Sequence, residues 1–273
     1  MQGGCQTCLT VDESQITSSS RLCDPAIPKK VMQTWKTSAE GIPEHWKSSP
    51  EQIALHMPDW EYTLMTDEMN RAFVAEHFPD FLETFDNFPH GIQRADAIRV
   101  CWLYVHGGLY MDLDLHIRKP IQHLFCEEAD LYVVRSQNFK WFYTNAFMAS
   151  KAKHPFWLIY LDEMKKPDAW WAVTHHLKVL NSTGPLAFTR SINRALREGM
   201  DLKIHELPDN LLSGCSVCDP KPCQLKESYI ATLEGSSWVK SDGEFFTWVY
   251  CRSWRILFIV LIVVFIIWWS RRR

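Results

Sequence analysis

Short apolar runs alternate with stretches of helical spacing along most of this sequence. Strands are predicted at 27–35, 60–65, 109–111, 131–134, 144–149 and 200–206, where β-branched, aromatic and other apolar residues cluster between turn-forming residues. Apolar residues recur at helical spacing in 43–57, 68–77, 92–106, 155–165 and 186–197. Alternation of strands and helices is typical of an α/β sheet. We therefore expect a single mixed sheet flanked by helices.

The two ends of the chain depart from this pattern. Residues 1–26 are rich in Ser, Thr, Gln and Gly and lack a basic start or a long apolar run, so we expect a flexible tail without a signal peptide. Residues 256–269 are uninterrupted apolar sequence. As a helix this run rises only about 21 Å, against about 30 Å of hydrocarbon in a bilayer. The tryptophans and arginines on both sides are nevertheless typical of a membrane interface.

We therefore predict three parts: the tail at 1–26, a globular domain at 27–250 and a transmembrane helix at 254–270. The last part is a single-pass C-terminal anchor, with a buried core helix as the alternative. Basic residues lie on both sides of the apolar run, so the positive-inside rule leaves the orientation open.

Charge and cysteine content narrow the possible partners. The net charge is −3, from 29 basic and 32 acidic residues without a long basic run, which argues against a nucleic-acid partner. The spacings Cys5-x2-Cys8 and Cys215-x2-Cys218-x4-Cys223 are compatible with local disulfides or with zinc ligands. The sequence does not decide between these two.

An acidic pair, Asp112 and Asp114, follows the short strand 109–111. Gly107 and Gly108 end the preceding helix, and the carboxyl ends of strands are where open α/β sheets bind ligands. Carboxylates suit Mg²⁺ or Mn²⁺, and such an ion can hold a diphosphate. We therefore predict a metal site at this strand end.

Several ordered motifs resemble one family of enzymes. They are Ile27-Pro28-Lys29, Gln33-Thr34-Trp35-Lys36, Pro58-Asp59-Trp60-Glu61-Tyr62, Gly91 to Arg99 followed by Gly-Gly-x-Tyr-x-Asp-x-Asp, His154-Pro155-Phe156, Thr183-Gly184-Pro185 and Gly235-Ser236-Ser237-Trp238. Together they resemble the Asp-x-Asp sugar-binding glycosyltransferases, which include initiating α-1,6-mannosyltransferases and inositol phosphorylceramide mannosyltransferases. The resemblance implies a GT-A type, Rossmann-like nucleotide-sugar-binding catalytic domain and a retaining hexosyltransferase. It favours GDP-mannose as donor ahead of UDP-sugars, Mn²⁺ or Mg²⁺ as cofactor, and a membrane-proximal glycolipid or glycan as acceptor.

The resemblance also implies roles for individual residues. In related glucosylating toxins, residues placed like Asp96 and Arg99 bind hydroxyls of the donor sugar. By the same analogy, Trp35 would stack on the nucleotide base, Asp114 would ligate the metal, and Asp112 would contact the ribose and a metal-bound water. The remaining expected donor-site residues are Tyr110, Asn145, Ser236 and Trp238, and Glu234 is expected as a metal ligand.

Glu234 stands within a departure from the family pattern. Many members carry a histidine shortly before the Gly-Ser-Ser-Trp segment, where this chain reads Thr232-Leu233-Glu234. This supports an alternative, a catalytically weakened membrane-anchored binding or scaffold protein with the same fold. A haloacid-dehalogenase phosphatase is disfavoured because His116 stands where Thr or Val is expected.

Two further expectations concern location and histidines. An endomembrane location, Golgi or ER, fits the resemblance, and the side of the membrane is left open. His175 and His176 lack acidic or thiol partners at ligand spacing, so we expect them on a helix surface.

Overall fold

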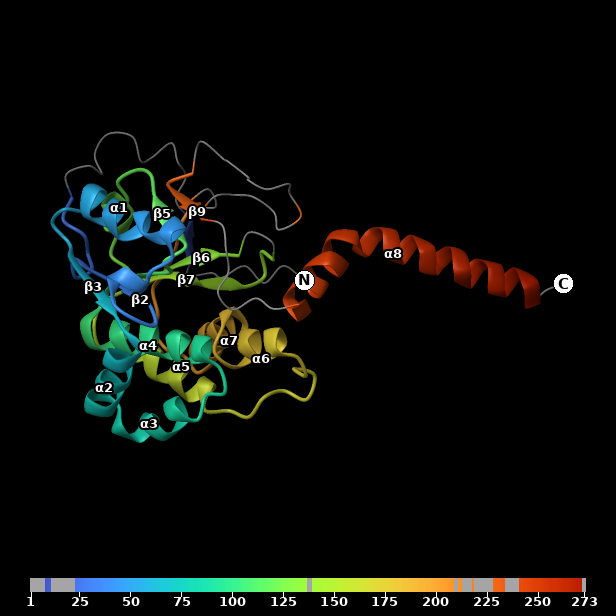
Figure 1. Cartoon of the computed structure of the whole chain (residues 1–273), viewed down its shortest axis with the longest axis horizontal. Helices are drawn as coiled ribbons and strands as arrows, with labels where there is room; N and C mark the ends of the chain where they lie inside the picture. Colours follow the sequence, from blue (N-terminus) through green and yellow to red (C-terminus); the bar gives the residue numbers. More distant parts are fainter. Residues whose placement is uncertain are drawn as a thin grey trace.

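A mixed sheet forms the centre of the molecule (Figure 1). The computed structural model describes residues 8–10, 23–136, 139–208, 211–212, 218, 228–233 and 241–271. Within them, seven strands follow the order β1-β8-β6-β7-β4-β2-β3. The strands are β1 (Cys8–Thr10), β2 (Lys30–Thr34), β3 (Glu61–Met65), β4 (Gly108–Met111), β6 (Leu131–Arg135), β7 (Tyr143–Ser150) and β8 (Ile204–Glu206). A separate antiparallel pair consists of β5 (Leu115–Ile117) and β9 (Ile230–Thr232).

Strand direction makes the sheet mixed. Strand β2 lies between β3 and β4 and is parallel to both, whereas β7 is antiparallel to β4 and to β6. The predicted mixed α/β sheet is therefore confirmed, and the six strands expected from the sequence correspond to β2, β3, β4, β6, β7 and β8.

Helices cover both faces of the sheet. They are α1 (Ser48–His56), α2 (Asp67–His77), α3 (Pro79–Asp86), α4 (Gly91–His106), α5 (Phe156–Met164), α6 (His175–Ser182), α7 (Pro185–Arg197) and α8 (Ser241–Arg271). Figure 1 shows α1 on one side of the sheet and α2, α4 and α5 on the other. Alternate strand residues supply the two cores: Met32 packs with the α4 side, and its neighbour Val31 packs with the α1 side.

The sequence patterns did not define every helix or helix start. The eight-residue helix α3 was not predicted. For α6, also eight residues long, no bounds were predicted beyond the expectation that His175 and His176 lie on a helix. Helix α2 begins at Asp67, and its N-cap is Thr66, whose Oγ1 accepts a hydrogen bond of 3.3 Å from the backbone N–H of Met69. Asp67 is thereby left to face a cavity described below.

Two glycines connect α4 to β4. Gly107 and Gly108 have φ values of 66° and 85°, a region that L residues with side chains rarely adopt. A Cβ atom at Gly108 would lie 2.4 Å from the carbonyl oxygen of Lys30. The close approach lets β4 pair directly with β2 and fixes where the chain emerges at Asp112.

The predicted transmembrane helix at 254–270 is wrong. A helix does form there, as part of the 31-residue α8, which extends away from the sheet in Figure 1. Among the residues that the structure describes, no helix is both long enough and apolar enough to span a bilayer. The uninterrupted apolar run inside α8, 256–269, rises about 21 Å, against about 30 Å of hydrocarbon in a bilayer.

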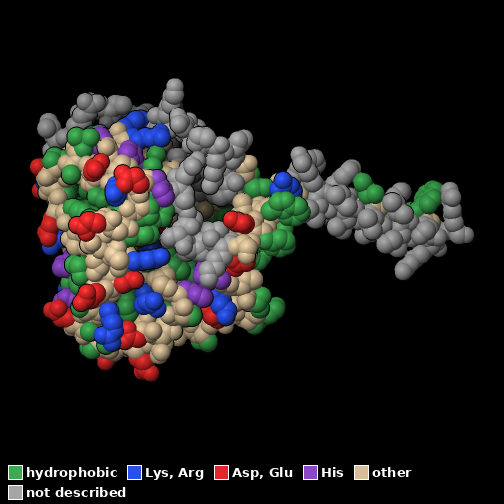
Figure 2. All heavy atoms as spheres, viewed as in Figure 1, with side chains coloured by type: hydrophobic (Ala, Val, Ile, Leu, Met, Phe, Trp, Pro, Cys, Tyr) green, Lys and Arg blue, Asp and Glu red, His purple; other side chains and the backbone are tan. Residues whose placement is uncertain are grey.

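Aromatic side chains gather where α8 leaves the globular part. Trp141, Phe245 and Trp248 are 66%, 58% and 49% exposed. Figure 2 shows hydrophobic side chains on the surface at this point. The start of α8 is fixed to α6, because Asp242 Oδ2 accepts a hydrogen bond of 2.7 Å from the backbone N–H of His176.

Two disulfides join segments far apart in the sequence. Cys23 pairs with Cys126 across 103 residues, and Cys218 pairs with Cys251 across 33. Cys218 therefore forms neither a local disulfide nor a zinc site with its neighbours. Cys5, Cys215 and Cys223 lie outside the described residues, and nowhere in the described part do three or more His, Cys, Asp or Glu residues form a group that can hold a metal ion.

Candidate active site

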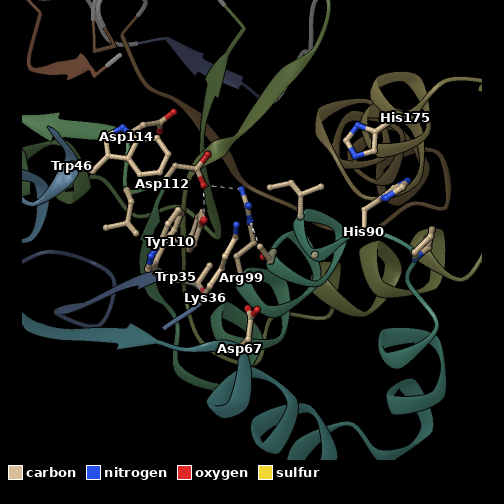
Figure 3. A pocket seen from close by; sticks show the side chains of 16 residues that line it. Trp35, Lys36, Trp46, Asp67, His90, Arg99, Tyr110, Asp112, Asp114 and His175 are labelled. Atoms are coloured by element: carbon tan, nitrogen blue, oxygen red, sulfur yellow. Dashed lines mark hydrogen bonds and ion pairs between the residues drawn. The ribbon is translucent and has the colours of Figure 1, made fainter. Parts of the chain in front are cut away.

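A cavity of about 350 Å³ opens at the carboxyl ends of β2 and β4 (Figure 3). Parallel strands end at the same edge of a sheet, and a ligand can bind in the crevice there. The first turns of α2, α4 and α6 provide the other walls. The lining residues are Thr34, Trp35, Lys36, Trp46, Asp67, Pro89, His90, Gly91, Ile92, Ala95, Arg99, Tyr110, Asp112, Leu113, Asp114 and His175.

Beneath the cavity lies a buried polar network centred on Asp96. One carboxylate oxygen accepts from Asn145 Nδ2 at 2.9 Å, and the other accepts from Thr183 Oγ1 at 2.7 Å. Arg99 Nη2 lies 3.0 Å from Asp96 Oδ1, with both side chains almost fully buried. Asp96 and Asn145 do not line the cavity themselves. Asp96 is thus held by three groups below the cavity floor.

Arg99 connects this network to the acidic pair. Its Nη1 donates to the backbone carbonyl of Asn145 at 2.8 Å and lies 3.1 Å from Asp112 Oδ1. Tyr110, whose ring packs 4.4 Å from the guanidinium carbon, donates its hydroxyl to the same Asp112 oxygen at 2.5 Å. One oxygen of Asp112 is therefore fixed by two donors, and its side chain is 31% exposed.

Charge and burial shift the titration of these groups. Burial raises the pKa of Asp96, and the nearby Arg99 guanidinium and hydrogen bonds offset this only in part. Burial lowers the pKa of Arg99, but the carboxylates of Asp112 and Asp96 raise it to a net value above the ordinary one. Arg99 is therefore a permanent cation under the cavity.

Asp114 occupies the turn that follows β4. Its backbone carbonyl accepts from the N–H of Leu233 at 2.6 Å, and its side chain is half-buried. Gln33 Nε2 donates to the carbonyl of Asp112 at 3.2 Å and to Ser49 Oγ at 2.9 Å, which fixes the turn from below. Removal from water, together with the charge of Asp112, raises the pKa of Asp114 to about 7.

The two carboxylates fit a divalent cation. Asp112 and Asp114 line one cavity and are close enough for their charges to interact, as the raised pKa of Asp114 reflects. Magnesium-type ions are commonly bound by one or two carboxylates, with substrate phosphates and water completing the shell. Glu234, the predicted additional ligand, lies outside the described residues.

Aromatic side chains form the wall beside the acidic pair. Trp35 and Trp46 are perpendicular, with ring centroids 5.4 Å apart. Trp35 Nε1 donates to the carbonyl of Gly41 at 2.8 Å, which holds the ring in place. Lys36 Nζ lies 5.5 Å from the centre of the Trp35 ring. A planar base can pack on such a wall.

The structure brings together most of the predicted site residues. Trp35, Arg99, Tyr110, Asp112 and Asp114 line the cavity, whereas Asp96 and Asn145 lie directly below it. Ser236 and Trp238, like Glu234, lie outside the described residues. Their roles, and those of the residues that are placed, stay predictions.

Sequence reasoning missed several residues of this site. Trp46, Asp67, His90 and His175 line the cavity without having been assigned to it. His175 in particular was expected on a helix surface, and that expectation is wrong because the first turn of α6 faces the cavity. Thr183 had one available signal, its place in the Thr-Gly-Pro motif.

Sequence comparisons relate the chain to known glycosyltransferases. The family model described as a glycosyltransferase sugar-binding region containing a DXD motif matches residues 43–131. The mannosyl phosphorylinositol ceramide synthase SUR1 of Saccharomyces cerevisiae is 39% identical over 219 residues, which are 80% of this chain and 53% of that protein. Inositol phosphoceramide mannosyltransferase 1 of Schizosaccharomyces pombe is 30% identical over 244 residues, 88% of this chain and 71% of that protein.

Two further findings concern coverage. The chain spans only 53% to 62% of the length of SUR1 and of three other curated relatives. Among solved structures, the PaToxG glycosyltransferase is similar with a TM-score of 0.45 and 20% identity, over 67% of this chain and 75% of that one. On the sequence comparisons, the chain belongs to the family of glycosyltransferases with a DXD-containing sugar-binding region, which includes the inositol phosphoceramide mannosyltransferases.

Proposed function

We propose that this chain is a retaining mannosyltransferase that takes mannose from GDP-mannose and transfers it to a phosphoinositol-type sphingolipid. The observation that carries the proposal is the linked set of Arg99, Asp112 and Asp114 in one cavity at the carboxyl ends of β2 and β4. The names of the relatives, which are inositol phosphoceramide mannosyltransferases, support mannose and this acceptor class.

In the proposed complex, the nucleotide lies along the wall of Trp35 and Trp46, and the diphosphate lies at Asp112 and Asp114. A divalent cation bound by these carboxylates, with Mn²⁺ proposed ahead of Mg²⁺, supplies charge neutralisation to the diphosphate as the nucleotide leaves. Tyr110 and Arg99 keep Asp112 oriented toward the cavity, so its position is set before the donor binds.

The sugar lies over Arg99, which we propose as a donor to its hydroxyls. Asp96 holds the guanidinium from below, and its expected hydrogen bond to a sugar hydroxyl stays a prediction. The acceptor hydroxyl attacks the anomeric carbon on the face from which the phosphate leaves, and the leaving phosphate takes the hydroxyl proton. Retention follows, and no carboxylate of the chain has to act as a base.

The proposed setting is the lumen of the endomembrane system. The disulfides Cys23–Cys126 and Cys218–Cys251 support it, since disulfides persist in oxidising compartments such as the ER lumen. The exposed aromatic residues at the start of α8 support an acceptor presented near a lipid surface, because amphipathic rings favour such interfaces.

A donor panel tests the proposed reaction. Purified protein is offered GDP-mannose, UDP-galactose, UDP-glucose and UDP-N-acetylglucosamine, with Mn²⁺, with Mg²⁺ or with a chelator, and released nucleotide is measured. We expect hydrolysis of GDP-mannose that requires the metal and is lost in Asp114→Asn. Turnover of a UDP-sugar alone would replace the donor, and an absence of both turnover and binding would favour the non-catalytic scaffold.

A further inference from the structure

Asp67 stands just past the end of β3, next to the residues that carry the aromatic wall. Strands β2 and β3 are parallel, and the backbone N–H of Asp67 donates to the Lys36 carbonyl at 3.4 Å. The backbone N–H of Trp35 donates in the same way to the Met65 carbonyl at 3.0 Å. These two bonds continue the pairing past the ends of both strands. Asp67 therefore lies beside the segment of Trp35 and Lys36.

The carboxylate of Asp67 is not used by the fold. Thr66 takes the N-cap position of α2, and within the described part of the chain the Asp67 side chain forms no hydrogen bond or ion pair. Asp67 lines the cavity, and Figure 3 shows its carboxylate pointing into the cavity at the end remote from Asp112 and Asp114. The carboxylate is therefore available to a ligand.

Two cations act on this carboxylate. Partial burial raises the pKa of Asp67, and the charges of Arg94 and Lys36 act against that rise. Lys36 Nζ lies 5.5 Å from the centre of the Trp35 ring, so one ammonium group serves both side chains. The ionised carboxylate, which the two cations favour, offers two acceptor oxygens and no donor. Asp67 therefore suits a ligand edge that carries two adjacent N–H donors.

The proposed donor pose brings an edge of the nucleobase to Asp67. With the diphosphate at the acidic pair, the nucleoside extends along the wall of Trp35 and Trp46 toward the other end of the cavity, where Asp67 lies. A base that stacks on Trp35 has its face against the ring and its edge toward the surrounding wall. Every base has a face that can stack, so the wall at the edge distinguishes one base from another.

Guanine has the edge that Asp67 fits. Its N1–H and 2-amino group are neighbouring donors, and one carboxylate can accept from both. Uracil has a single N–H on the corresponding edge, with a carbonyl oxygen on each side, and a carboxylate repels those oxygens. Adenine has an acceptor nitrogen in place of N1–H. A carboxylate here attracts one base and disfavours the others, and both effects contribute to specificity.

We propose that the Asp67 carboxylate accepts hydrogen bonds from N1–H and the 2-amino group of guanine, and so selects GDP-linked over UDP-linked donors. The proposal rests on the mannosyltransferase function stated above and names the residue that recognises the base. It makes Asp67 a specificity-determining residue, separate from the acidic pair proposed to hold the diphosphate.

Binding of nucleoside diphosphates to the purified chain tests the two hydrogen bonds. Calorimetric titration with Mn²⁺ compares GDP with inosine diphosphate, which lacks the 2-amino group, and with xanthosine diphosphate, which has a carbonyl in its place. We expect the wild type to bind GDP about tenfold or more tightly than inosine diphosphate, since one charge-assisted hydrogen bond is lost. We expect xanthosine diphosphate and UDP to bind more weakly than GDP.

Asp67→Asn is expected to exchange this preference. The amide accepts from N1–H and donates to a carbonyl at position 2, so it complements xanthine rather than guanine. We expect GDP to bind this variant about tenfold or more weakly, and xanthosine diphosphate to bind it more tightly than GDP. The KM for GDP-mannose rises with kcat nearly unchanged, because the base is remote from the bond that breaks.

The matched control is Asp80→Asn. Asp80 is an exposed aspartate in the first turn of α3 and does not line the cavity. We expect this variant to bind all four nucleotides as the wild type does.

Several results would overturn the proposal. Equal affinity of the wild type for GDP and inosine diphosphate does so without any variant. A parallel loss of GDP and UDP affinity in Asp67→Asn, or xanthosine diphosphate that binds this variant no better than GDP, has the same effect. In these cases a wild type that hydrolyses GDP-mannose retains the proposed function. A wild type that binds UDP but not GDP removes the proposed donor together with the role of Asp67.

Discussion

Arg99 Nη1 lies 3.1 Å from Asp112 Oδ1, which joins helix α4 to the end of strand β4 at the cavity floor. The same guanidinium is 3.0 Å from Asp96, so one buried cation serves two carboxylates. In a low-dielectric site, removing one partner of such a set leaves the others without compensation. The geometry of the acidic pair therefore depends on a residue thirteen positions earlier in the sequence.

Substitution of Arg99 is expected to affect stability as well as turnover. In Arg99→Lys, a single ammonium cannot reproduce the contacts to Asp96, Asp112 and the Asn145 carbonyl. We expect the free energy of unfolding to fall by about 2–4 kcal/mol, together with loss of donor turnover. Urea unfolding and the hydrolysis assay measure the two effects. The matched control is Arg71→Lys at the exposed Arg71–Asp86 pair, for which we expect no measurable change in the unfolding midpoint.

Removal of the Tyr110 hydroxyl is expected to act mainly on the reaction. Tyr110→Phe keeps the ring against Arg99 but deletes the hydrogen bond to Asp112. We expect Mn²⁺ affinity or kcat to fall about 10-fold to 100-fold, as for other groups that orient metal-binding carboxylates. Calorimetric titration and the hydrolysis assay are the measurements. Tyr132→Phe, whose hydroxyl bonds to the Glu127 carbonyl away from the cavity, should leave both values unchanged.

The raised pKa of Asp114 predicts a pH dependence of stability for the metal-free protein. Its pKa moves from 3.8 in a model peptide to about 7 in the folded protein. Between these values the folded state holds a proton that the unfolded state has lost, so this group's contribution to stability falls as pH rises through the interval.

Asp114→Asn removes the charge that creates this penalty. We expect the variant to unfold about 2–8 °C above the wild type at pH 8 without metal, and the gain to shrink toward pH 4. With Mn²⁺ added, only the wild type should gain further stability. Thermal unfolding across pH, with and without metal, tests both statements. A variant less stable than the wild type at pH 8 would contradict the assignment.

Trp35 is expected to contribute to donor binding through its ring. Trp35→Ala should raise the KM for GDP-mannose about tenfold or more, whereas Trp35→Phe, which keeps an aromatic face, should raise it less. The exposed Trp141, which does not line the cavity, provides the matched control as Trp141→Ala. If Ala and Phe at position 35 behave alike, ring stacking is not the role of Trp35.

Sequence patterns predicted those features of the site that depend on residues close together in the sequence. Gly107-Gly108 predicted the end of α4, and the strand after it predicted where Asp112 and Asp114 emerge. The helical spacing of 92–106 predicted the helix that carries Asp96 and Arg99, which form a buried ion pair in the structure. Each of these inferences depends on neighbours within one turn or one strand.

Such patterns could not predict contacts between residues that are far apart in the sequence. Thr183 reaches Asp96 across 87 residues, and His175 meets His90 only because α6 packs beside the start of α4. Cys218 likewise pairs with Cys251 and not with the cysteines nearest to it. The tertiary fold sets these pairings, and the spacing along the chain does not encode them.

Product formation from the proposed pair of substrates tests the proposed function directly. Purified protein is incubated with GDP-mannose, inositol phosphoceramide and Mn²⁺, and the lipid fraction is analysed by mass spectrometry. We expect mannosylated inositol phosphoceramide with the wild type and none with Asp114→Asn or with chelator. Absence of this product from a folded wild type that binds GDP-mannose, or equal product from Asp114→Asn, would contradict the proposed function.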